Sequence, residues 1–216
     1  ASPPSSSSTG SGVSRGQGIP LLKRVIIAIT GATGCIYGIR LLQVLAELPE
    51  VETHLILSPA GIITAEHETG FDKKAISVLA DVCHRHKDFG ASISSGSFPI
   101  HSMVVAPCSM NTLGSIAHGL DNNLISRAAG VTLKERRTLV LLPRETPLHL
   151  VHLRNMTIVT EMGGIIAPPV PSFYQHPVNI EDIVNQTVGR TLDSLGIDAP
   201  DLVQRWEGLN PESTPK

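Results

Sequence analysis

RVIIAITGATG, residues 24–34, is the stretch of sequence that decides the fold. After Arg24, five apolar residues form a continuous run with the length of a strand that is buried on both faces. The TGATG turn at 30–34 follows directly, and its small residues let the backbone approach a ligand. A helical stretch from about Ile36 to Leu48 comes next, and its N-terminus would favour a phosphate. A tight βα turn without a ligand is the alternative, because the motif is not a full GxGxxG.

Further strands and helices alternate along the chain. Alternation of this kind is typical of a doubly wound parallel sheet, so we expect a Rossmann-like, flavodoxin-like three-layer α/β domain at 21–208. A flexible tail at 209–216 would follow it. The expected strands are 53–57, 102–106, 139–142 and 164–167. The expected helices are 60–69, 74–87, 148–162 and 180–195, with a turn and helical sequence between 107 and 136.

The first 20 residues, ASPPSSSSTGSGVSRGQGIP, are low-complexity Ser/Pro/Gly sequence. Such a composition buries too little apolar surface to offset its ordering entropy, so we expect a disordered leader. No acidic residue precedes Glu47, whereas Arg15, Lys23 and Arg24 are basic. A Ser-rich, acid-poor leader is typical of an organellar transit-peptide remnant, and an ordinary disordered tail is the alternative.

Composition argues against several classes of function. A net charge of -2 argues against nucleic-acid binding by charge attraction and favours a small-molecule ligand. The sequence has no run near the ~20 apolar residues that cross a membrane. Cys35, Cys83 and Cys108 form neither a paired framework nor a CxxC motif, which favours reduced thiols in a reducing compartment. A DDxxD-type cluster is absent as well, so Mg²⁺-diphosphate chemistry has no visible ligands.

Polar side chains follow four of the expected strands, at the ends where an open parallel sheet binds ligands. Alternatives are open at each place: Ser58 could cap a helix, Glu68 could be solvated, and Cys108 is better explained as a packed thiol than as a nucleophile. Glu145 could transfer protons while Arg144 tunes its pKa, or the two could form a structural ion pair. The candidates after the four strands are Thr33; Ser58 and Glu68; Ser109, Asn111 and Thr112; and Arg144 and Glu145.

Two helices carry cations that could hold a phosphate. In NNLISRAAGVTLKERR at 122–137, Arg127 and Lys134 are seven residues apart and Asn123 lies four before Arg127, so the three share a helix face. A solvated face is the alternative for them. Arg190 lies near the apolar stripe of the last helix, where an unpaired charge is costly. Either a buried anion or snorkelling to solvent would explain it.

Taken together, these segments resemble the UbiX/Pad1 flavin prenyltransferases from about Lys23 to Trp206. The most specific parts are the 122–137 segment, LLPRETPL at 141–148, HLRNM at 152–156 and the pair Phe173-Tyr174. With its leader the chain looks like a eukaryotic, fungal-type member, which implies a mitochondrial location, with the cytoplasm as the alternative. The resemblance also implies a large homo-oligomer, a dodecamer in the family, whose active sites form between subunits.

The resemblance implies roles for individual residues. FMN would bind at the TGATG turn, where Thr33 replaces the serine common in bacterial members and keeps its hydroxyl. Glu68, Arg127 and Glu145 would be catalytic, the last two beside the prenyl phosphate. The implied FMN-binding residues are Gly31, Ala32, Thr33, Ser58, Ser109, Met110, Asn111, Thr112 and Arg144. The implied ligands of the prenyl phosphate are Lys134, Tyr174 and Arg190.

The chemistry implied by the resemblance is alkylation of a flavin without a metal. Reduced FMN would be the nucleophile and dimethylallyl phosphate the electrophile: C1′ of the prenyl group joins N5, and C3′ then joins C6. Cationic side chains and Tyr174 would stabilise the departing phosphate, and Glu145 would assist proton transfer. The product, prenylated FMN, would serve a UbiD/Fdc-type decarboxylase.

Three other functions fit parts of this pattern. An FMN-dependent cysteine decarboxylase would share the fold and the flavin site, but its catalytic histidine and substrate clamp are not found in the sequence. A non-catalytic flavin-binding subunit would not need Lys134, Glu145 and Arg190. A nicotinamide oxidoreductase is least favoured, because TGATG lacks the full dinucleotide fingerprint and no acidic ribose ligand ends the second strand.

Overall fold

The computed structural model of the chain describes residues 22–199, 202 and 208. The expected leader at 1–20 and the expected tail at 209–216 lie outside the described residues. Among the helices of the described part, none combines the length and the apolar character that a membrane span needs.

Six parallel strands form one sheet in the order β3-β2-β1-β4-β5-β6. The strands are β1 (Lys23–Ile29), β2 (Val51–Leu57), β3 (Val82–His84), β4 (Ser102–Cys108), β5 (Thr138–Pro143) and β6 (Ile165–Ile166). The chain builds outward from β1 to β3 and then returns to the other side of β1, so the order reverses between β1 and β4. The expected doubly wound fold is confirmed, and its reversal point is where such sheets bind ligands.

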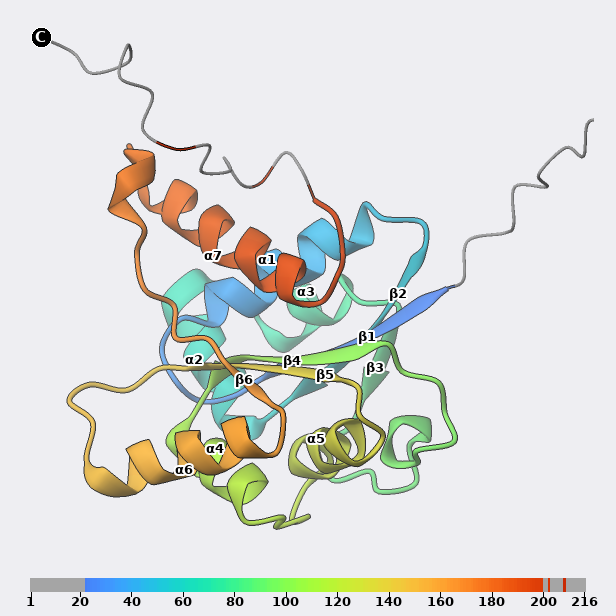
Figure 1. The fold of residues 1–216 in the computed structure, drawn as a ribbon. Coiled ribbons are helices and arrows are strands. Elements are labelled where there is room, and N and C mark those ends of the chain that lie inside the picture. The colour runs from blue at the N-terminus through green and yellow to red at the C-terminus, as the bar shows by residue number, and fades with distance from the viewer. Residues whose placement is uncertain (1–21, 200–201, 203–207, 209–216) are drawn as a thin grey trace, which may run out of the picture.

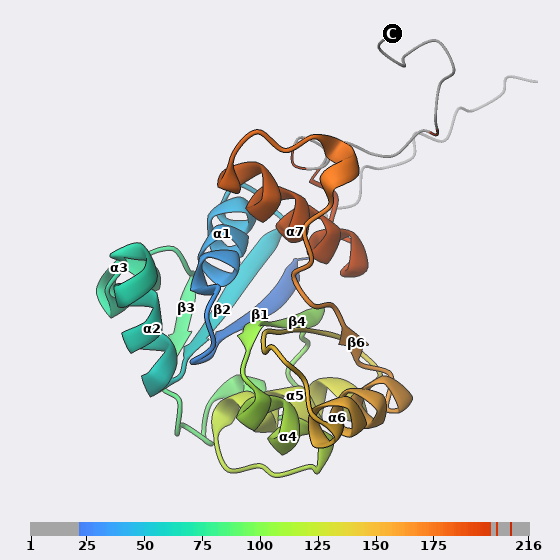
Figure 2. The same ribbon diagram turned by 90° about the vertical axis from the view of Figure 1, so that its left-hand side faces the viewer.

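Helices cover both faces of the sheet (Figures 1 and 2). On one face lie α1 (Cys35–Ala46), α2 (Pro59–Thr69), α3 (Lys73–Ser77) and α7 (Ile180–Ser194). On the other lie α4 (Met110–Ala117), α5 (Leu124–Lys134) and α6 (Leu150–Glu161). Two short 3-10 helices, η1 (Ser92–Ser94) and η2 (Phe173–Gln175), lie in connecting loops. The helices α1 and α4, which follow the two strands at the reversal point, therefore lie on opposite faces.

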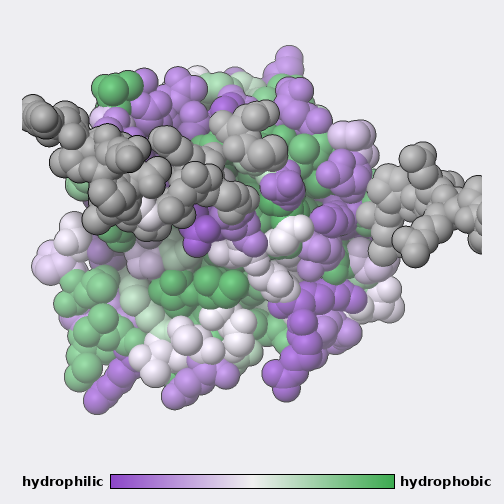
Figure 3. Space-filling view, turned by 45° about the horizontal axis from the view of Figure 1, so that its top comes forward, coloured by the Kyte–Doolittle hydropathy of each residue, from purple (hydrophilic) through white to green (hydrophobic). Residues whose placement is uncertain are grey.

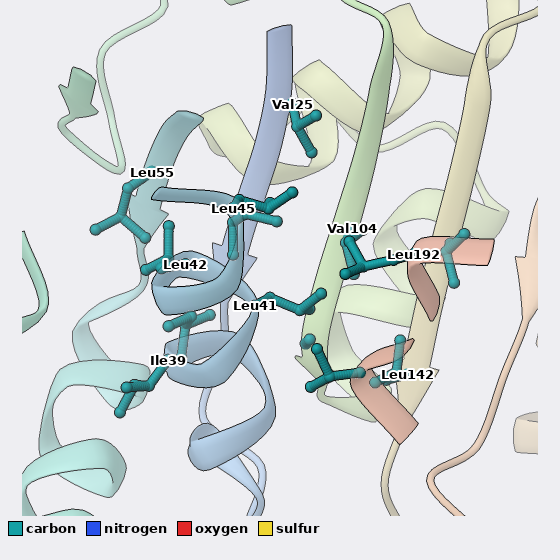
Figure 4. Close-up of a cluster of buried hydrophobic side chains, with 14 of the residues drawn as sticks. Val25, Ile39, Leu41, Leu42, Leu45, Leu55, Val104, Leu142 and Leu192 are labelled. Atoms are coloured by element: carbon teal, nitrogen blue, oxygen red, sulfur yellow. The ribbon is translucent and has the colours of Figure 1, made fainter. Parts of the chain in front are cut away.

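Two aliphatic cores result from the alternation of side chains along the strands. Ile27 and Ile29 of β1 belong to the core with α1 and α7, whereas Ile26 and Ala28 belong to the core with α4 and α5. Both faces of the strands are thus buried, which is why continuous apolar runs predicted them. Figure 4 shows part of the first core, which includes Leu41, Leu45, Leu55, Val104, Leu142 and Leu192.

The helix expected at 74–87 is wrong in its second half. The helix α3 ends at Ser77, and Val82–His84 form the edge strand β3 beside β2. The carboxylate of Asp81 accepts hydrogen bonds from the amide and the hydroxyl of Thr53, both at 2.8 Å, and fixes the chain alongside β2. Because this short strand carries a cysteine and a histidine and no apolar run, hydrophobic periodicity does not reveal it.

Gly38 brings α1 very close to the carboxyl ends of β1 and β4. A Cβ atom built on Gly38 would lie less than 3.0 Å from the carbonyl oxygen of Ala106 and from side-chain atoms of Ile29. Real Cβ atoms essentially never make such contacts, so α1 can hold this position only with glycine. Gly34, the N-cap of α1, has a φ of 97°, in the left-handed region that favours glycine. The two glycines together fix where α1 begins.

We expect Gly38→Ala to lower the free energy of unfolding by about 1–3 kcal/mol, the scale of overpacking in a core. Gly114→Ala in α4 is the matched control, because its Cβ would lie 3.4 Å from the nearest atom, in the Asn155 amide. There the gain in helix propensity, about 1 kcal/mol, should appear without a clash. Urea denaturation followed by circular dichroism measures both, and equal stability of the two variants would contradict the close packing of α1.

Candidate functional site

The hydroxyl of Thr30 ties β1 to β4 where the strand order reverses. Its Oγ1 donates to the carbonyl oxygen of Pro107 at 2.7 Å and accepts from the amide of Ser109 at 2.8 Å. The side chain is buried, so it satisfies two backbone groups that water does not reach. The bridge sets the spacing between the turn at 30–34 and the start of α4. The sequence did not predict this role of Thr30, because nothing around a threonine at the end of one strand indicates which distant strand it will contact.

The start of α4 presents backbone amides to the carboxyl edge of the sheet. Ser109 caps this helix: its Oγ accepts from the amide of Thr112 at 3.3 Å, and its hydroxyl donates to Thr112 Oγ1 at 3.0 Å. The amides of Met110 and Asn111, in the first turn, precede any intrahelical acceptor. A helix N-terminus with donors of this kind attracts a phosphate.

Backbone contacts bring the ends of β2 and β5 to the same edge. The amide of Ser58 donates to the carbonyl oxygen of Ile29 at 3.1 Å, and the amide of Arg144 donates to that of Cys108 at 3.3 Å. Ser58 also caps α2, as the capping interpretation predicted, because its Oγ accepts from the amide of Gly61 at 2.9 Å. One edge, which we call the flavin edge, therefore gathers the residues expected to bind FMN, which are Gly31, Ala32, Thr33, Ser58, Ser109, Met110, Asn111, Thr112 and Arg144.

A carboxylate from α2 occupies the N-terminus of α1. Glu68 Oε2 accepts from the amide of Gly34 at 2.9 Å and from the amide of Cys35 at 3.1 Å. These two amides are therefore not available to a phosphate, contrary to our expectation for this turn. Glu68 neutralises the helix N-terminus itself, and the two amides that it accepts from directly follow Thr33 in the chain.

The donors that stay open at this edge fit a ligand that carries a phosphate. The amides of Met110 and Asn111 suit the phosphate, and the exposed side chain of Arg144 adds a positive charge. The side chain of Thr33 is exposed beside them. A Cβ on Gly31 would lie less than 3.0 Å from Ala60. Any residue other than glycine would therefore change the conformation of this turn. This donor set suits the phosphate of FMN.

Arg144 and Glu145 do not form the ion pair that was the alternative for them. Neither residue takes part in the ion pairs of the described residues. Both are exposed, and Glu145 Oε1 accepts a hydrogen bond from the amide of Thr146 at 3.0 Å. The carboxylate and the guanidinium are therefore both available to a ligand at this edge.

On α5, Arg127 and Lys134 face the loop that carries η1. Arg127 Nε donates to the carbonyl oxygen of Ser94 at 3.1 Å. Lys134 forms an ion pair with Glu135, and a Cβ on Gly96 would lie 2.5 Å from Lys134 Nζ. The opposite side of the helix is buried in the core, as its apolar residues predicted. Each cation is also paired with a carboxylate, Arg127 with Asp121 at 2.9 Å and Lys134 with Glu135. We call Arg127 and Lys134, beside the backbone around 94–96, the basic cluster.

Asn123 is not part of this cationic face. Its Oδ1 caps α5 by accepting from the amides of Ile125 at 2.9 Å and Ser126 at 3.1 Å. The expected alignment of Asn123 with Arg127 and Lys134 is therefore wrong. A cap residue lies outside the helix, where helical periodicity no longer describes the direction of a side chain.

Lys134 lies far from the flavin edge within one copy of the chain. It ends α5 shortly before Thr138 begins β5, whereas Arg144 follows the carboxyl end of that strand. The length of β5 separates the two ends by about 17 Å at roughly 3.3 Å per residue. Arg190 lies on α7, across the sheet from α5 (Figure 1). One copy does not bring Lys134, Arg144 and Arg190 to a single ligand.

Arg190 is exposed, which agrees with snorkelling to solvent and not with a buried anion. Its side chain is 62% exposed and pairs with Asp193 at 2.7 Å. The neighbouring Val188 points into the core instead, so the stripe runs beside Arg190. Arg190 and Ser172 line one hollow of about 200 Å³ between α7 and the loop before it. The structure thus places Arg190 near the loop that carries Tyr174.

The start of α6 exposes a group of apolar side chains, which we call the α6 patch. Figure 3 shows hydrophobic residues gathered at the lower left of that view, where α6 begins. Exposed apolar groups of this kind mark contact surfaces. The patch consists of Leu148, Leu150, Val151 and Leu153, which are between 41% and 58% exposed.

The two buried cysteines, Cys35 and Cys108, have thiols of low reactivity. Burial, and then the nearby Glu68 carboxylate, raise the pKa of the Cys35 thiol to about 12. Burial raises the pKa of the Cys108 thiol to about 12, in agreement with a packed thiol rather than a nucleophile. Within the described residues, no group of three His, Cys, Asp or Glu side chains could hold a metal ion.

The chain matches known proteins along most of its length. The family model described as Flavoprotein matches residues 20–192. The flavin prenyltransferase UbiX of Escherichia coli K12 is 53% identical over 188 residues, which cover 87% of this chain and 100% of that relative.

Two solved structures resemble the fold closely. The crystal structure of a dodecameric FMN-dependent UbiX-like decarboxylase from Escherichia coli O157:H7 has a TM-score of 0.84 at 47% identity, and covers 86% of this chain and 100% of that one. The crystal structure of AnUbiX (PadA1) in complex with FMN and dimethylallyl pyrophosphate has a TM-score of 0.84 at 47% identity, and covers 87% of this chain and 99% of that one.

We expect one thiol per chain, that of the exposed Cys83, to react rapidly with Ellman's reagent near pH 8. Cys35 and Cys108, with pKa values of about 12, carry roughly one thiolate in ten thousand molecules at that pH and are also buried. Their reaction should rise only as the pH approaches 12 or the chain unfolds. Cys83→Ser is the control that removes the rapid phase, and a rapid thiol left in that variant would contradict the burial of the other two.

Proposed function

Since this chain belongs to the flavoprotein family and, within it, to the UbiX flavin prenyltransferases, we propose that it transfers a dimethylallyl group from dimethylallyl phosphate to N5 and C6 of reduced FMN. The observation that carries the proposal is the 53% identity to the flavin prenyltransferase UbiX of Escherichia coli K12, over the full length of that relative. The open donors at the carboxyl edge of the sheet support it independently.

The carboxyl edge of the sheet would hold the flavin. The amides of Met110 and Asn111 and the hydroxyl of Ser109 would bind the phosphate at the start of α4. The turn that ends in Thr33 would contact the ring, and Arg144 would lie beside both. Bound in this way, reduced FMN supplies the two nucleophilic ring positions.

The basic cluster on α5, together with Arg190 and Tyr174, would hold the prenyl phosphate. When the C1′–O bond breaks, negative charge grows on the departing phosphate, and these donors would stabilise it. In the free chain Lys134 pairs with Glu135 and Arg190 with Asp193. Exposed ion pairs of this kind are weak, so a phosphate can replace the carboxylates.

Two carboxylates at the flavin edge would have different catalytic roles. Glu145 is exposed and keeps a single backbone contact, so it can give a proton to the phosphate or take one from the ring as C6 is alkylated. Glu68 is fixed by two amides of the α1 N-terminus, beside Thr33. It would orient that hydroxyl and add negative charge near the flavin.

A complete site would need more than one copy of the chain. Lys134 and Arg144 lie at opposite ends of β5, and α7 lies across the sheet from α5. The dodecameric state of one structural neighbour supports an assembly of many copies. The α6 patch offers an apolar surface for contacts between them.

Two further proposals concern the cell rather than the site. Prenylated FMN would pass to a UbiD/Fdc-type decarboxylase, which a coupled assay with such an enzyme would test. The Ser-rich, acid-poor composition of residues 1–20 supports a mitochondrial location. A fluorescent fusion of the full chain tests this, and a diffuse cytoplasmic signal would contradict it.

We expect the purified protein, given reduced FMN and dimethylallyl phosphate, to form a flavin that is heavier by one prenyl group. Mass spectrometry of the extracted flavin detects it, and dimethylallyl diphosphate is run in parallel. Glu145→Gln should slow a single turnover roughly 10²–10⁴-fold, the scale of general acid–base catalysis, without changing FMN affinity. If neither dimethylallyl phosphate nor dimethylallyl diphosphate gives a prenylated flavin, the proposed function is refuted.

We expect Lys134→Ala and Arg190→Ala each to abolish most activity, and mixed oligomers of the two to regain part of it. If each site takes the two residues from different copies, about a quarter of the sites in an equal mixture have both. The two variants are co-expressed with different tags, isolated as mixed oligomers and compared with tagged mixtures of one variant. Mixed oligomers as inactive as the single variants would show that both residues come from one copy.

A further inference from the structure

Gln186 on α7 has a buried amide without a partner. Its side chain is 6% exposed. Of the buried side chains in the described part of the chain, it is the one whose nitrogen and oxygen both lack a hydrogen bond. An unsatisfied donor and an unsatisfied acceptor on one side chain are costly, so this amide calls for a partner that brings both kinds of group.

The amide lies between two hollows that run along α7. Gln186 and Ser172 line both hollows, one of about 300 Å³ and one of about 200 Å³. Arg190, one helical turn further on, lines the second of them. Gln186 therefore shares the first hollow with residues 172–177 and the second with the cation proposed for the prenyl phosphate.

The loop above these hollows is fixed at its two ends. The amide of Ala167 donates to the carbonyl oxygen of Leu141 at 2.8 Å, and the amide of Val178 donates to Asp182 Oδ2 at 2.9 Å. Between these anchors, several backbone bonds join near neighbours. The middle of the loop is open to solvent, with Tyr174 52% exposed.

We propose that Gln186 is a positioning residue for prenyl transfer, whose amide bonds the backbone of residues 172–176 when the prenyl phosphate draws Tyr174 toward Arg190. This inference rests on the proposed function, because it concerns the same phosphate site. Gln186 itself touches neither the phosphate nor the flavin. It holds the loop in the position from which the Tyr174 hydroxyl reaches the phosphate.

The chemistry of the amide identifies the loop as its partner. A phosphate offers only acceptors, so it could satisfy Nε2 of Gln186 and would leave Oε1 unpaired. A peptide backbone offers both N–H and C=O groups, which match the two atoms of a primary amide. Ser172, Gln175 and His176 line the same hollow as Gln186, so their backbone offers both kinds of group there.

The test compares Gln186→Met, which keeps the length of the side chain and removes its hydrogen bonds, with the wild type. Gln186→Leu is the second variant if the first does not fold, and Gln43→Leu on α1, outside both hollows, is the matched control. Steady-state kinetics give KM for dimethylallyl phosphate and kcat separately. Hydrogen exchange of the 168–177 peptide is measured with FMN alone and with FMN plus dimethylallyl phosphate.

In the wild type and in Gln43→Leu, dimethylallyl phosphate should protect the 168–177 peptide from exchange. In Gln186→Met this protection should be lost and KM should rise roughly 10- to 100-fold, the scale of two neutral hydrogen bonds, with FMN affinity unchanged. Unchanged KM and unchanged protection would overturn the inference and would assign the amide to a buried water. A wild type that forms no product would refute the proposed function instead, and the exchange data would still decide whether Gln186 holds the loop.

Discussion

Between β1 and β4 the sheet reverses its strand order, and the buried hydroxyl of Thr30 joins the two strands there through Pro107 and Ser109. The turn after β1 and the helix after β4 face the proposed ring and phosphate of the flavin, so this bridge sets the distance between the two ends of the ligand. Gly38 adds a steric limit, because α1 packs directly on the end of β4. The geometry of the flavin edge is thus set by contacts at the centre of the sheet, and these contacts position the loops that follow β1 and β4.

The distribution of charge agrees with the proposal that a complete site needs more than one copy of the chain. If Arg144, Lys134 and Arg190 lay together in a free chain, their positive charges would repel one another in the absence of a bound anion. Here the sheet and its helices keep these cations apart, and nearby carboxylates such as Glu135 and Asp193 pair with two of them. Assembly would then create the anion site and its substrate affinity together, and the exchange of weak, exposed ion pairs for a phosphate would accompany binding.

Much of the fold could be predicted from the sequence, because buried parallel strands appear as continuous apolar runs. The edge strand β3 could not, since its pairing depends on Asp81 and not on hydrophobicity. At the site, the residues after the strand ends were predictable, because parallel strands end at one edge. Periodicity left both explanations of Arg190 open, because it gives a direction around the helix but not the limit of the buried stripe. Periodicity also gave no signal for Gln186, because the feature that singles it out is a buried amide without hydrogen bonds.

Glu68 restricts which nucleotides this strand order can accept. Sheets with the same order bind dinucleotides with the pyrophosphate on the N-terminus of the first helix. Here an internal carboxylate already takes the amides of Gly34 and Cys35. An incoming pyrophosphate would find these donors occupied and would meet a like charge. The chain therefore carries its own counter-anion at the start of α1, which disfavours a pyrophosphate there and leaves the start of α4 as the open helix N-terminus.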